Sequence, residues 1–336
     1  MEFGEGGYIM GRWNHGMRDG HCTVETFRNS LSCITGEYRD DKLNGKAKIQ
    51  FDDDSSLIGY FKDGVLHGFC RYFDKKGRLT FFGMHRNGKA FGTCWRVIRG
   101  GGCVVGRVDE EGKLSGINLA YLYPDFKTAF VGTFKDGVMD FSQVTALTGV
   151  TEENGIKVPH FAEPDGRLYR REISSVEVLS TTPTLIDPYE TEMVMVKPST
   201  VVGADEGLFS KKSVEPNTVL SFYNGIRLKP DRENEPDWEK NAYKIFDPAI
   251  KDGTIDIPPS CWSTASYCAS MGHKVNHSFV PNSMFSVFDH PRFGVIPCIV
   301  SIHDIMAGEE IFIRYGYELD YAPDWYLDAW EKGEQK

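Results

Sequence analysis

The sequence predicts a mostly β protein in two parts: an N-terminal antiparallel β-sheet of repeated hairpins, then a domain of short, irregular strands that ends in a short helix. Two observations predict this architecture. Glycines recur every 23 to 26 residues through the first part, from Gly11 to Gly132, which is typical of a repeated structural unit. The second part alternates short apolar runs with turn signals such as Asn224-Gly225.

The repeat unit begins with glycine, usually has an aromatic residue at its third position, and has a second glycine nine residues after the first. The segment 59–68, GYFKDGVLHG, shows the full pattern. The pairs Asp63-Gly64, Asn87-Gly88 and Asp136-Gly137 favour two-residue hairpin turns. For most of the glycines we expect no role beyond building turns. The pattern resembles MORN repeats, which implies an elongated antiparallel sheet whose units contact chiefly their neighbours.

The length and composition argue against a membrane, secreted, nucleic-acid-binding or metal-binding protein. At 336 residues the chain is long enough for two hydrophobic cores, and no apolar run reaches the length of a transmembrane helix. The first residues lack the basic start and apolar block of a signal peptide, so we expect an intracellular protein. A net charge of −10 argues against broad contact with nucleic-acid phosphates. The 8 cysteines show no C-x-x-C spacing, so we expect reduced thiols and no metal site.

The chain divides into a repeat domain (1–140), a transitional β segment (141–188) broken up by prolines, and a C-terminal domain (189–336). In the C-terminal domain we expect one helix at 263–271 and another that begins at Pro323. The expected strands are 193–196, 219–223, 254–257 and 311–313, together with a pair at 284–288 and 295–302.

Three motifs follow one another in the C-terminal domain. The first is the turn and strand start at Glu206-Gly207-Leu208-Phe209. The second, Asn276-His277-Ser278-Phe279 followed by Pro281-Asn282, predicts an ordered, irregular turn, because Asn and His favour local hydrogen bonds. The third is a strand that ends on Tyr315-Gly316-Tyr317. Together the motifs resemble the signature of SET-domain lysine methyltransferases, which implies a pseudo-knotted SET domain and S-adenosyl-L-methionine as the cofactor.

The resemblance implies roles for residues of this chain. Methyl transfer from a sulfonium is an in-line displacement that needs alignment and a dry channel, and it needs neither a metal nor a covalent nucleophile. Tyr315 matches the catalytic tyrosine of the family, and we expect Tyr223 and Tyr317 to share the catalytic channel with it. The expected cofactor-binding residues are Ala204, Asp205, Glu206, Asn276, His277 and Trp325. The expected substrate-binding residues are Tyr223, His277, Phe285 and Tyr315.

The combination of MORN repeats and a SET domain in one chain resembles the family of histone H3 lysine-4 methyltransferases. The resemblance implies basic, lysine-containing substrates, namely the histone H3 tail and non-histone proteins. It also implies a monomer without direct contact to nucleic acid or membrane, located in the nucleus at chromatin and also in the cytoplasm.

The chain departs from the family at several positions. Phe285 replaces a channel tyrosine, and because it lacks the hydroxyl we expect dimethyl-lysine to form more readily. Pro297 replaces a lysine of the substrate groove, Ala329 replaces an acidic cofactor contact, and the segment between Tyr317 and Trp325 is shortened.

Two functions of other classes are alternatives to the enzyme. One is a catalytically weak SET fold that binds methyl-lysine or a partner, and the other is a MORN scaffold at a membrane or the cytoskeleton. Asn276, His277 and Tyr315 are all present, which favours the enzyme over both alternatives.

Overall fold

The chain forms two compact units, Met1–Tyr169 and Arg170–Lys336. The division falls inside the segment 141–188 that the sequence predicts to be transitional. None of the helices in the described ranges is long and apolar enough to cross a membrane. The computed structural model describes residues 2–3, 7–25, 31–228 and 243–331.

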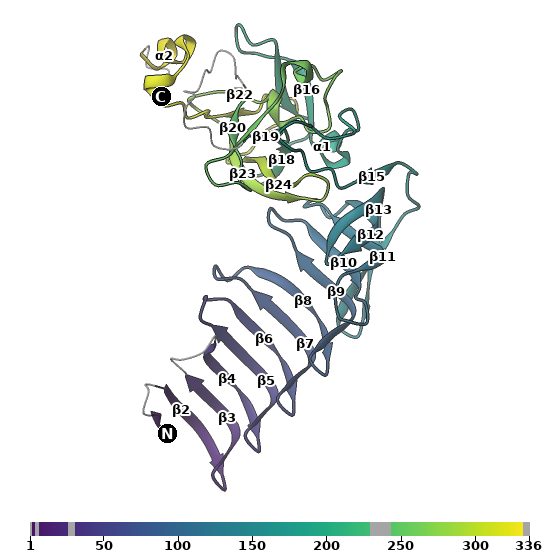
Figure 1. The fold of residues 1–336 in the computed structure, drawn as a ribbon, viewed down its shortest axis with the longest axis vertical. Coiled ribbons are helices and arrows are strands. Elements are labelled where there is room, and N and C mark those ends of the chain that lie inside the picture. The colour runs from purple at the N-terminus through teal and green to yellow at the C-terminus, as the bar shows by residue number, and fades with distance from the viewer. Residues whose placement is uncertain (1, 4–6, 26–30, 229–242, 332–336) are drawn as a thin grey trace. The chain divides into compact units, whose positions relative to one another are not determined.

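The first unit is a single antiparallel sheet in which each strand pairs with the next one in the chain (Figure 1). Its strands are β1 (Glu2–Phe3), β2 (Gly7–Asn14), β3 (Met17–Glu25), β4 (Leu31–Arg39), β5 (Lys42–Phe51), β6 (Ser56–Lys62), β7 (Val65–Phe73), β8 (Leu79–Arg86), β9 (Lys89–Val97), β10 (Cys103–Arg107), β11 (Gly116–Leu122), β12 (Thr128–Lys135), β13 (Val138–Glu153), β14 (Ile156–Phe161) and β15 (Leu168–Arg170), which pairs with β13. This meander confirms the predicted sheet of hairpins. The sheet continues without interruption through residue 140, because β13 pairs with both β12 and β14.

The hairpin turns have the backbone that the sequence predicts. Between β6 and β7, the φ angles of Asp63-Gly64 are 52° and 85°. Those of Asn87-Gly88 are 51° and 82°, and those of Asp136-Gly137 are 50° and 72°. Two successive residues in the left-handed region are characteristic of a type I′ turn, whose twist matches that of the flanking strands. The prediction is therefore confirmed for all three pairs.

The first glycine of each repeat unit lies in the middle of a strand, so the expectation that it only builds a turn is wrong. Gly59 pairs with Cys70, and a Cβ atom on Gly59 would lie 2.8 Å from the Cys70 Cβ. Gly83 pairs with Cys94, and a Cβ there would lie 2.4 Å from the thiol sulfur. Glycine is needed because the side chain on the next strand occupies the space. A row of paired residues crosses the sheet in this way: Gly11, Cys22, Gly36, Ala47, Gly59, Cys70, Gly83, Cys94 and Gly106.

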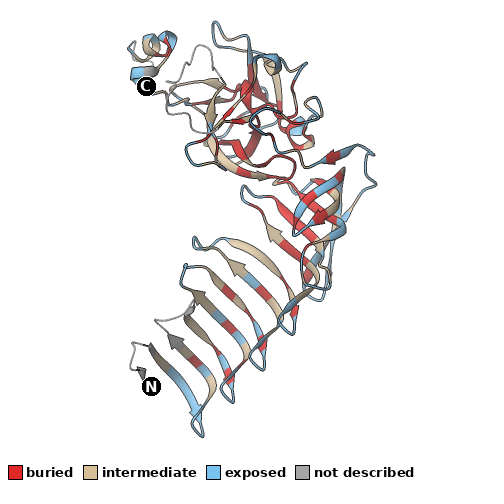
Figure 2. Ribbon diagram, in the orientation of Figure 1, coloured by how far each residue is buried: buried red, intermediate tan, exposed pale blue. Residues whose placement is uncertain are grey.

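Apolar side chains of the first unit gather in clusters. One cluster includes members of the glycine row, and its buried residues are Cys22, Tyr38, Leu43, Ala47, Leu57, Phe61 and Cys70. Another surrounds Trp95, whose Nε1 donates to the Lys157 carbonyl oxygen 2.8 Å away. Because Lys157 belongs to β14, this bond brings β14 against β9 and covers Trp95. Figure 2 shows that burial is most continuous in this part of the sheet.

The second unit contains several small sheets, as predicted (Figure 1). Its principal elements are α1 (Pro188–Met193), β16 (Val194–Pro198), β17 (Glu206–Ser210), β18 (Val219–Phe222), β19 (Ile226–Leu228), β20 (Ile245–Phe246), β21 (Thr254–Asp256), β22 (Asn276–His277), β23 (Ser283–His290), β24 (Gly294–Ser301), β25 (Phe312–Ile313) and α2 (Asp324–Glu331), with single 3-10 turns at Pro259–Cys261, Gly272–Lys274 and Leu319–Tyr321. The sheets are β16-β17, β18-β24-β23, β19-β21-β20 and β22-β25. The predicted β23–β24 hairpin and the C-terminal helix are confirmed.

The helix predicted at 263–271 does not form in this described part of the chain, so that prediction is wrong. After a turn that begins at Ser263, residues 267–271 have no regular secondary structure. The amides of Cys268 and Ala269 both donate to the carbonyl oxygen of Pro183, at 2.9 and 3.0 Å. Because these amides bond to a partner distant in sequence, they are not available for helical bonds.

The second and third sequence motifs lie side by side. β22 pairs with β25 in parallel, which places His277 opposite Ile313. Just beyond, the Asn282 side chain donates to the Glu310 carbonyl oxygen at 2.8 Å and accepts from the Phe312 amide at 2.8 Å. These contacts bring the two motifs into one site, as expected for a SET domain.

Candidate active site

A hydrogen-bond network holds the first motif against the second. The side-chain nitrogen of Asn276 lies 3.1 Å from Glu310 Oε1 and 3.0 Å from Ser199 Oγ. The same nitrogen donates to the Glu206 carbonyl oxygen, 2.9 Å away. Burial acts to raise the pKa of Glu310, but hydrogen bonds from its neighbours, Thr200 foremost, outweigh burial and lower that pKa. The Glu310 side chain is therefore an ionised acceptor at neutral pH.

Close contacts shape the expected cofactor-binding turn, 204–206. A Cβ atom on the following residue, Gly207, would lie 2.0 Å from Glu310 Oε1, so a larger residue would have to displace the Glu310 carboxylate. The nearly buried Lys274 places Nζ 2.7 Å from Glu206 Oε2. The turn with Ala204, Asp205 and Glu206 therefore lies directly beside the Asn-His motif.

His277 is neutral and lies among aromatic rings. Burial, and then the charge of Arg314, lower the pKa of His277 to about 4. Its Nδ1 accepts from the Tyr315 amide at 3.1 Å, so the ring proton resides on Nε2. That Nε2 is buried and has no hydrogen-bond partner in the described part of the chain. The surrounding rings, with centroids 4.5 to 5.8 Å away, are those of Phe279, Tyr315, Trp325 and Tyr326.

Tyr315 joins this aromatic cluster to the second motif. Its hydroxyl donates to the Val275 carbonyl oxygen at 2.8 Å. A phenol has one proton, so this bond leaves the oxygen lone pairs available as acceptors. Burial raises the pKa of Tyr315 above its ordinary value, which keeps the phenol protonated and unsuited to act as a base. Tyr317 packs edge-on against Tyr315 at 5.7 Å and against Trp325 at 6.1 Å.

Tyr223 and Phe285 form a second aromatic group. The Tyr223 hydroxyl donates to the Tyr243 carbonyl oxygen at 2.5 Å. Burial, and then the Tyr315 phenol, raise the pKa of Tyr223 well above its ordinary value, so the Tyr223 phenol stays protonated, as that of Tyr315 does. Phe285 stands edge-on to Tyr223, and Phe246 packs edge-on against Phe285. The residues expected in the lysine channel therefore occur together.

Sequence analysis does not identify Tyr243 or Lys274 as members of this site. The Tyr243 ring packs against Trp262 with centroids 5.2 Å apart. Burial, and then the charges of Glu206 and Asp205, raise the pKa of Tyr243, so its phenol stays protonated. No local motif marks Tyr243, whereas Lys274 lies two residues before the Asn-His pair, a proximity that could have indicated it.

The positions that depart from the family lie around the same residues. Pro297 is in β24, and its carbonyl oxygen accepts from the Tyr223 amide at 2.9 Å. Ala329 is in α2, the helix that also carries Trp325. Among the described residues there is no group of His, Cys, Asp and Glu that could hold a metal ion.

Three family profiles match the chain. The SET-domain profile matches residues 205–316, and the MORN-repeat profile matches residues 10–25, 35–56 and 58–77. The profile described as the N-terminal part of the histone H3 K4-specific methyltransferase SET7 matches residues 85–162. The matched segments therefore include most of the repeat region, the first two motifs, and Tyr315 and Gly316 of the third.

The histone-lysine N-methyltransferase SETD7 of Halocynthia roretzi is 37% identical over 366 aligned residues, which cover 90% of this chain and 94% of that protein. A solved structure, ctPRC2 in an autoinhibited conformation bound to S-adenosylmethionine, is 20% identical over 42% of this chain and 17% of its own, with a TM-score of 0.29, a likeness too weak to add to the assignment. Because the identity with SETD7 extends over nearly the whole of both proteins, the chain belongs to the SETD7 family of SET-domain histone-lysine N-methyltransferases.

Proposed function

We propose that this protein transfers methyl groups from S-adenosyl-L-methionine to lysine side chains of proteins. The observation that carries the proposal is the position of Tyr315. Its amide donates to His277 Nδ1 and its hydroxyl donates to the Val275 carbonyl oxygen, while its phenol is one of the groups that raise the pKa of Tyr223. One residue thus links the Asn-His motif to the aromatic channel. This link supports a cofactor bound at the Asn-His motif and a lysine side chain in the channel.

The residues at the motif suit this cofactor. The unpartnered, buried Nε2–H of His277 can donate to a bound group. The Trp325 ring is 50% exposed and offers a flat apolar surface for an adenine. The Glu206 carboxylate suits an ammonium group, and we propose that Ala204, Asp205 and Asn276 complete the site. When bound, the cofactor supplies an electrophilic methyl group on a sulfonium.

The channel favours the neutral form of the lysine amine and orients it. Burial disfavours the ammonium form, so an amine that enters the channel has a lowered pKa. The phenols of Tyr223 and Tyr315 already donate their protons to carbonyl groups, so their oxygens accept from the amine N–H and orient the nitrogen lone pair. Because both phenols stay protonated, neither takes the lysine proton, which leaves to solvent before the transfer.

We propose the histone H3 tail as one substrate, and basic segments of non-histone proteins as others. The name of the relative and the description of the matching N-terminal profile support a histone lysine. The net charge of −10 suits a basic peptide. We further propose a monomer that acts in the nucleus at chromatin and in the cytoplasm.

The test is incorporation of a labelled methyl group into an H3 tail peptide, compared with the same peptide in which the lysine at position four is arginine. We expect label in the first peptide only. His277→Ala should bind S-adenosylhomocysteine weakly and incorporate little label. A folded, cofactor-binding protein that labels none of a panel of lysine-containing peptides and histones would reject the proposal.

A further inference from the structure

Glu190 is a buried carboxylic acid in α1, outside the residues assigned to the site. Asp187 caps this helix and accepts from the amides of Tyr189 and Glu190, at 3.0 and 3.1 Å. The Glu190 side chain is fully inaccessible to solvent. A carboxyl group in such a position is costly unless its oxygens are hydrogen-bonded, so its partners are informative.

One oxygen of Glu190 binds two separate segments of the chain. Its Oε1 accepts from the Phe222 amide at 2.8 Å, in β18, and from the Ser221 hydroxyl. The same Oε1 accepts from the Met271 amide at 3.0 Å, in the loop that precedes β22. Its Oε2 is buried without a hydrogen-bond partner in the described part of the chain.

The two segments that meet at Glu190 carry the two halves of the proposed site. Phe222 directly precedes Tyr223 of the lysine channel. Met271 leads through a single 3-10 turn to Val275, whose carbonyl oxygen holds the Tyr315 hydroxyl. The segments touch closely, since a Cβ atom on Gly272 would lie 2.5 Å from the Phe222 carbonyl oxygen.

We infer that Glu190 is a positioning residue for methyl transfer, because its Oε1 clamps Phe222 to Met271 and so sets the distance between the phenol oxygens of Tyr223 and Tyr315. The inference rests on the proposed function and assigns Glu190 no contact with substrate or cofactor. The clamp acts through backbone amides, so any residue with an acceptor at the position of Oε1 preserves it, and an apolar residue abolishes it.

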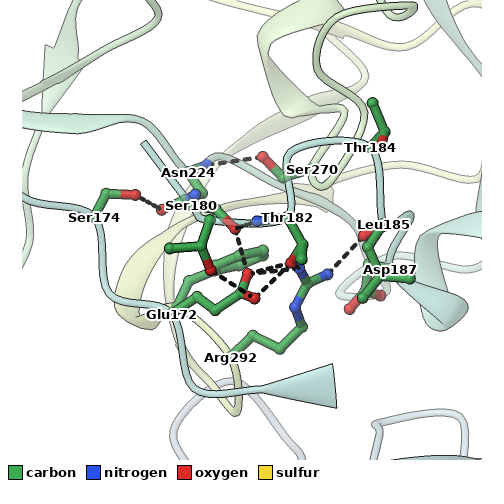
Figure 3. Close-up of polar contacts among 12 residues, drawn as sticks. Glu172, Ser174, Ser180, Thr182, Thr184, Leu185, Asp187, Asn224, Ser270 and Arg292 are labelled. Carbon is green, nitrogen blue, oxygen red and sulfur yellow. Dashed lines mark hydrogen bonds and ion pairs between the residues drawn. The ribbon is translucent and has the colours of Figure 1, made fainter. Parts of the chain in front are cut away.

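Charged groups on neighbouring elements are paired with each other rather than with Glu190. Asp187 Oδ2 lies 3.0 Å from His290 Nε2. Arg292 donates to Glu172 Oε2 at 3.0 Å, inside the polar cluster of Figure 3. No ion pair of Glu190 occurs among the described residues. Burial, and then the negative charge of Asp187, therefore raise the pKa of Glu190 to about 8.

The loop beside Glu190 contributes neutral groups. Figure 3 shows Ser270 bonded to Asn224, where the Asn224 amide donates to Ser270 Oγ at 3.0 Å. Burial is the main reason that the pKa values of Tyr267 and Cys268 are raised, so both stay protonated at neutral pH. Burial and the nearby Asp187 thus keep Glu190 protonated to a higher pH than an exposed carboxyl group. A raised carboxyl pKa means that the favourable contribution of neutral Glu190 is lost as the pH rises through about 8.

The first test observes the clamp without catalysis. Nuclear magnetic resonance of protein labelled at Phe and Met amides, titrated from about pH 6 to pH 10, should show the Phe222 and Met271 signals moving together with a midpoint near pH 8. Glu190→Gln keeps an acceptor oxygen but cannot ionise, so both signals should lose this transition. Amides that titrate independently, or that keep the transition in Glu190→Gln, would overturn the clamp.

The second test connects the clamp to turnover. The ratio of kcat for Glu190→Gln to wild type should stay near one, because the Gln side-chain oxygen can accept from the Phe222 and Met271 amides as Glu190 Oε1 does. Tyr189→Phe is the matched control, because it removes a bond from α1 to β18 (hydroxyl to Val219 carbonyl, 2.6 Å) and leaves the Glu190 carboxyl group unchanged. Its ratio should also stay near one.

Glu190→Leu, where it folds, should lower kcat about tenfold or more with KM for the peptide nearly unchanged. A loss of kcat in Glu190→Gln as large as that in Glu190→Leu, or an equal loss in Tyr189→Phe, would overturn the positioning role. Absence of methyl transfer by the wild-type protein would instead reject the proposed function, and the resonance titration would still decide whether the clamp exists.

Discussion

The ring of Phe285 stands edge-on to the ring of Tyr223, with centroids 6.0 Å apart and planes at 75°. Phe285 has no hydroxyl, so this side chain offers no oxygen that could fix a water or a methylated amine in one orientation. A lysine amine that has received one methyl group can therefore turn and present its lone pair again, while the aromatic rings still favour a cation.

We expect the wild-type protein to carry a substrate peptide to the dimethyl form, and Phe285→Tyr to stop mainly at one methyl, because the added hydroxyl fills the space needed for the turn. Mass spectrometry after exhaustive reaction measures the outcome. Phe246→Tyr is the control, since it adds the same hydroxyl to a neighbouring ring that is 45% exposed. A wild-type product that stays monomethylated and does not respond to Phe285→Tyr would contradict this prediction.

Tyr315→Phe should lower kcat about a hundredfold, because the amine loses an acceptor that orients it. The variant also loses the bond to the Val275 carbonyl oxygen, which corresponds to about 1 kcal/mol of unfolding free energy. Steady-state kinetics and thermal unfolding measure the two effects. Tyr189→Phe loses a comparable buried bond and should show only the stability change. Near-normal turnover in Tyr315→Phe would rule out its catalytic role.

The sequence predicts those parts of the fold that depend on residues adjacent in the chain. The pair Asp63-Gly64 specifies its turn because both residues tolerate the left-handed backbone. The role of Gly59 is not local, because the register of the next strand places Cys70 against it. The helix expected at 263–271 fails for a similar reason, since its amides bond to Pro183.

The same distinction holds for the site. The Asn276-His277 and Tyr315 motifs are recognisable because several of their residues are adjacent in sequence. Tyr243 and Glu190 have no such neighbours, and their importance comes from partners 20 and 81 residues away. Burial and pairing of this kind follow from the assembled fold, so a sequence pattern does not indicate them.

Asn276→Asp should weaken binding of S-adenosylhomocysteine more than Asn276→Ala does. The aspartate would place a second carboxylate about 3 Å from Glu310, and repulsion between like charges would open the 204–206 turn. Calorimetric titration gives the affinities. Adding Glu310→Gln to Asn276→Asp removes one of the two charges and should recover part of the binding. Wild-type affinity in both single variants would show that the network does not support the cofactor site.

Gly83→Ala should lower the unfolding free energy of the first unit by about 1 to 3 kcal/mol, because its Cβ would lie 2.4 Å from the Cys94 sulfur. Replacing Cys94 with glycine in that variant removes the clash and should restore part of the loss. Gly149→Ala is the control, since no atom lies within 4 Å of its Cβ. Chemical denaturation compares the three proteins, and equal stability of Gly83→Ala and Gly149→Ala would refute the packing role of the glycine row.

Deletion of residues 1–169 should leave a soluble, folded second unit, because the compact unit begins at Arg170. Deletion of residues 1–140 should behave worse, since it cuts through β13 and removes its partner β12. The β13–β14 hairpin would then expose Ile156, Leu147 and Phe161, which pack against the Trp95 cluster in the intact chain. Exposed apolar strands without a partner tend to aggregate. Circular dichroism, thermal unfolding and size-exclusion chromatography compare the two truncations. A more soluble protein from the deletion of residues 1–140 would contradict this prediction and show that the second unit needs the β13–β14 hairpin.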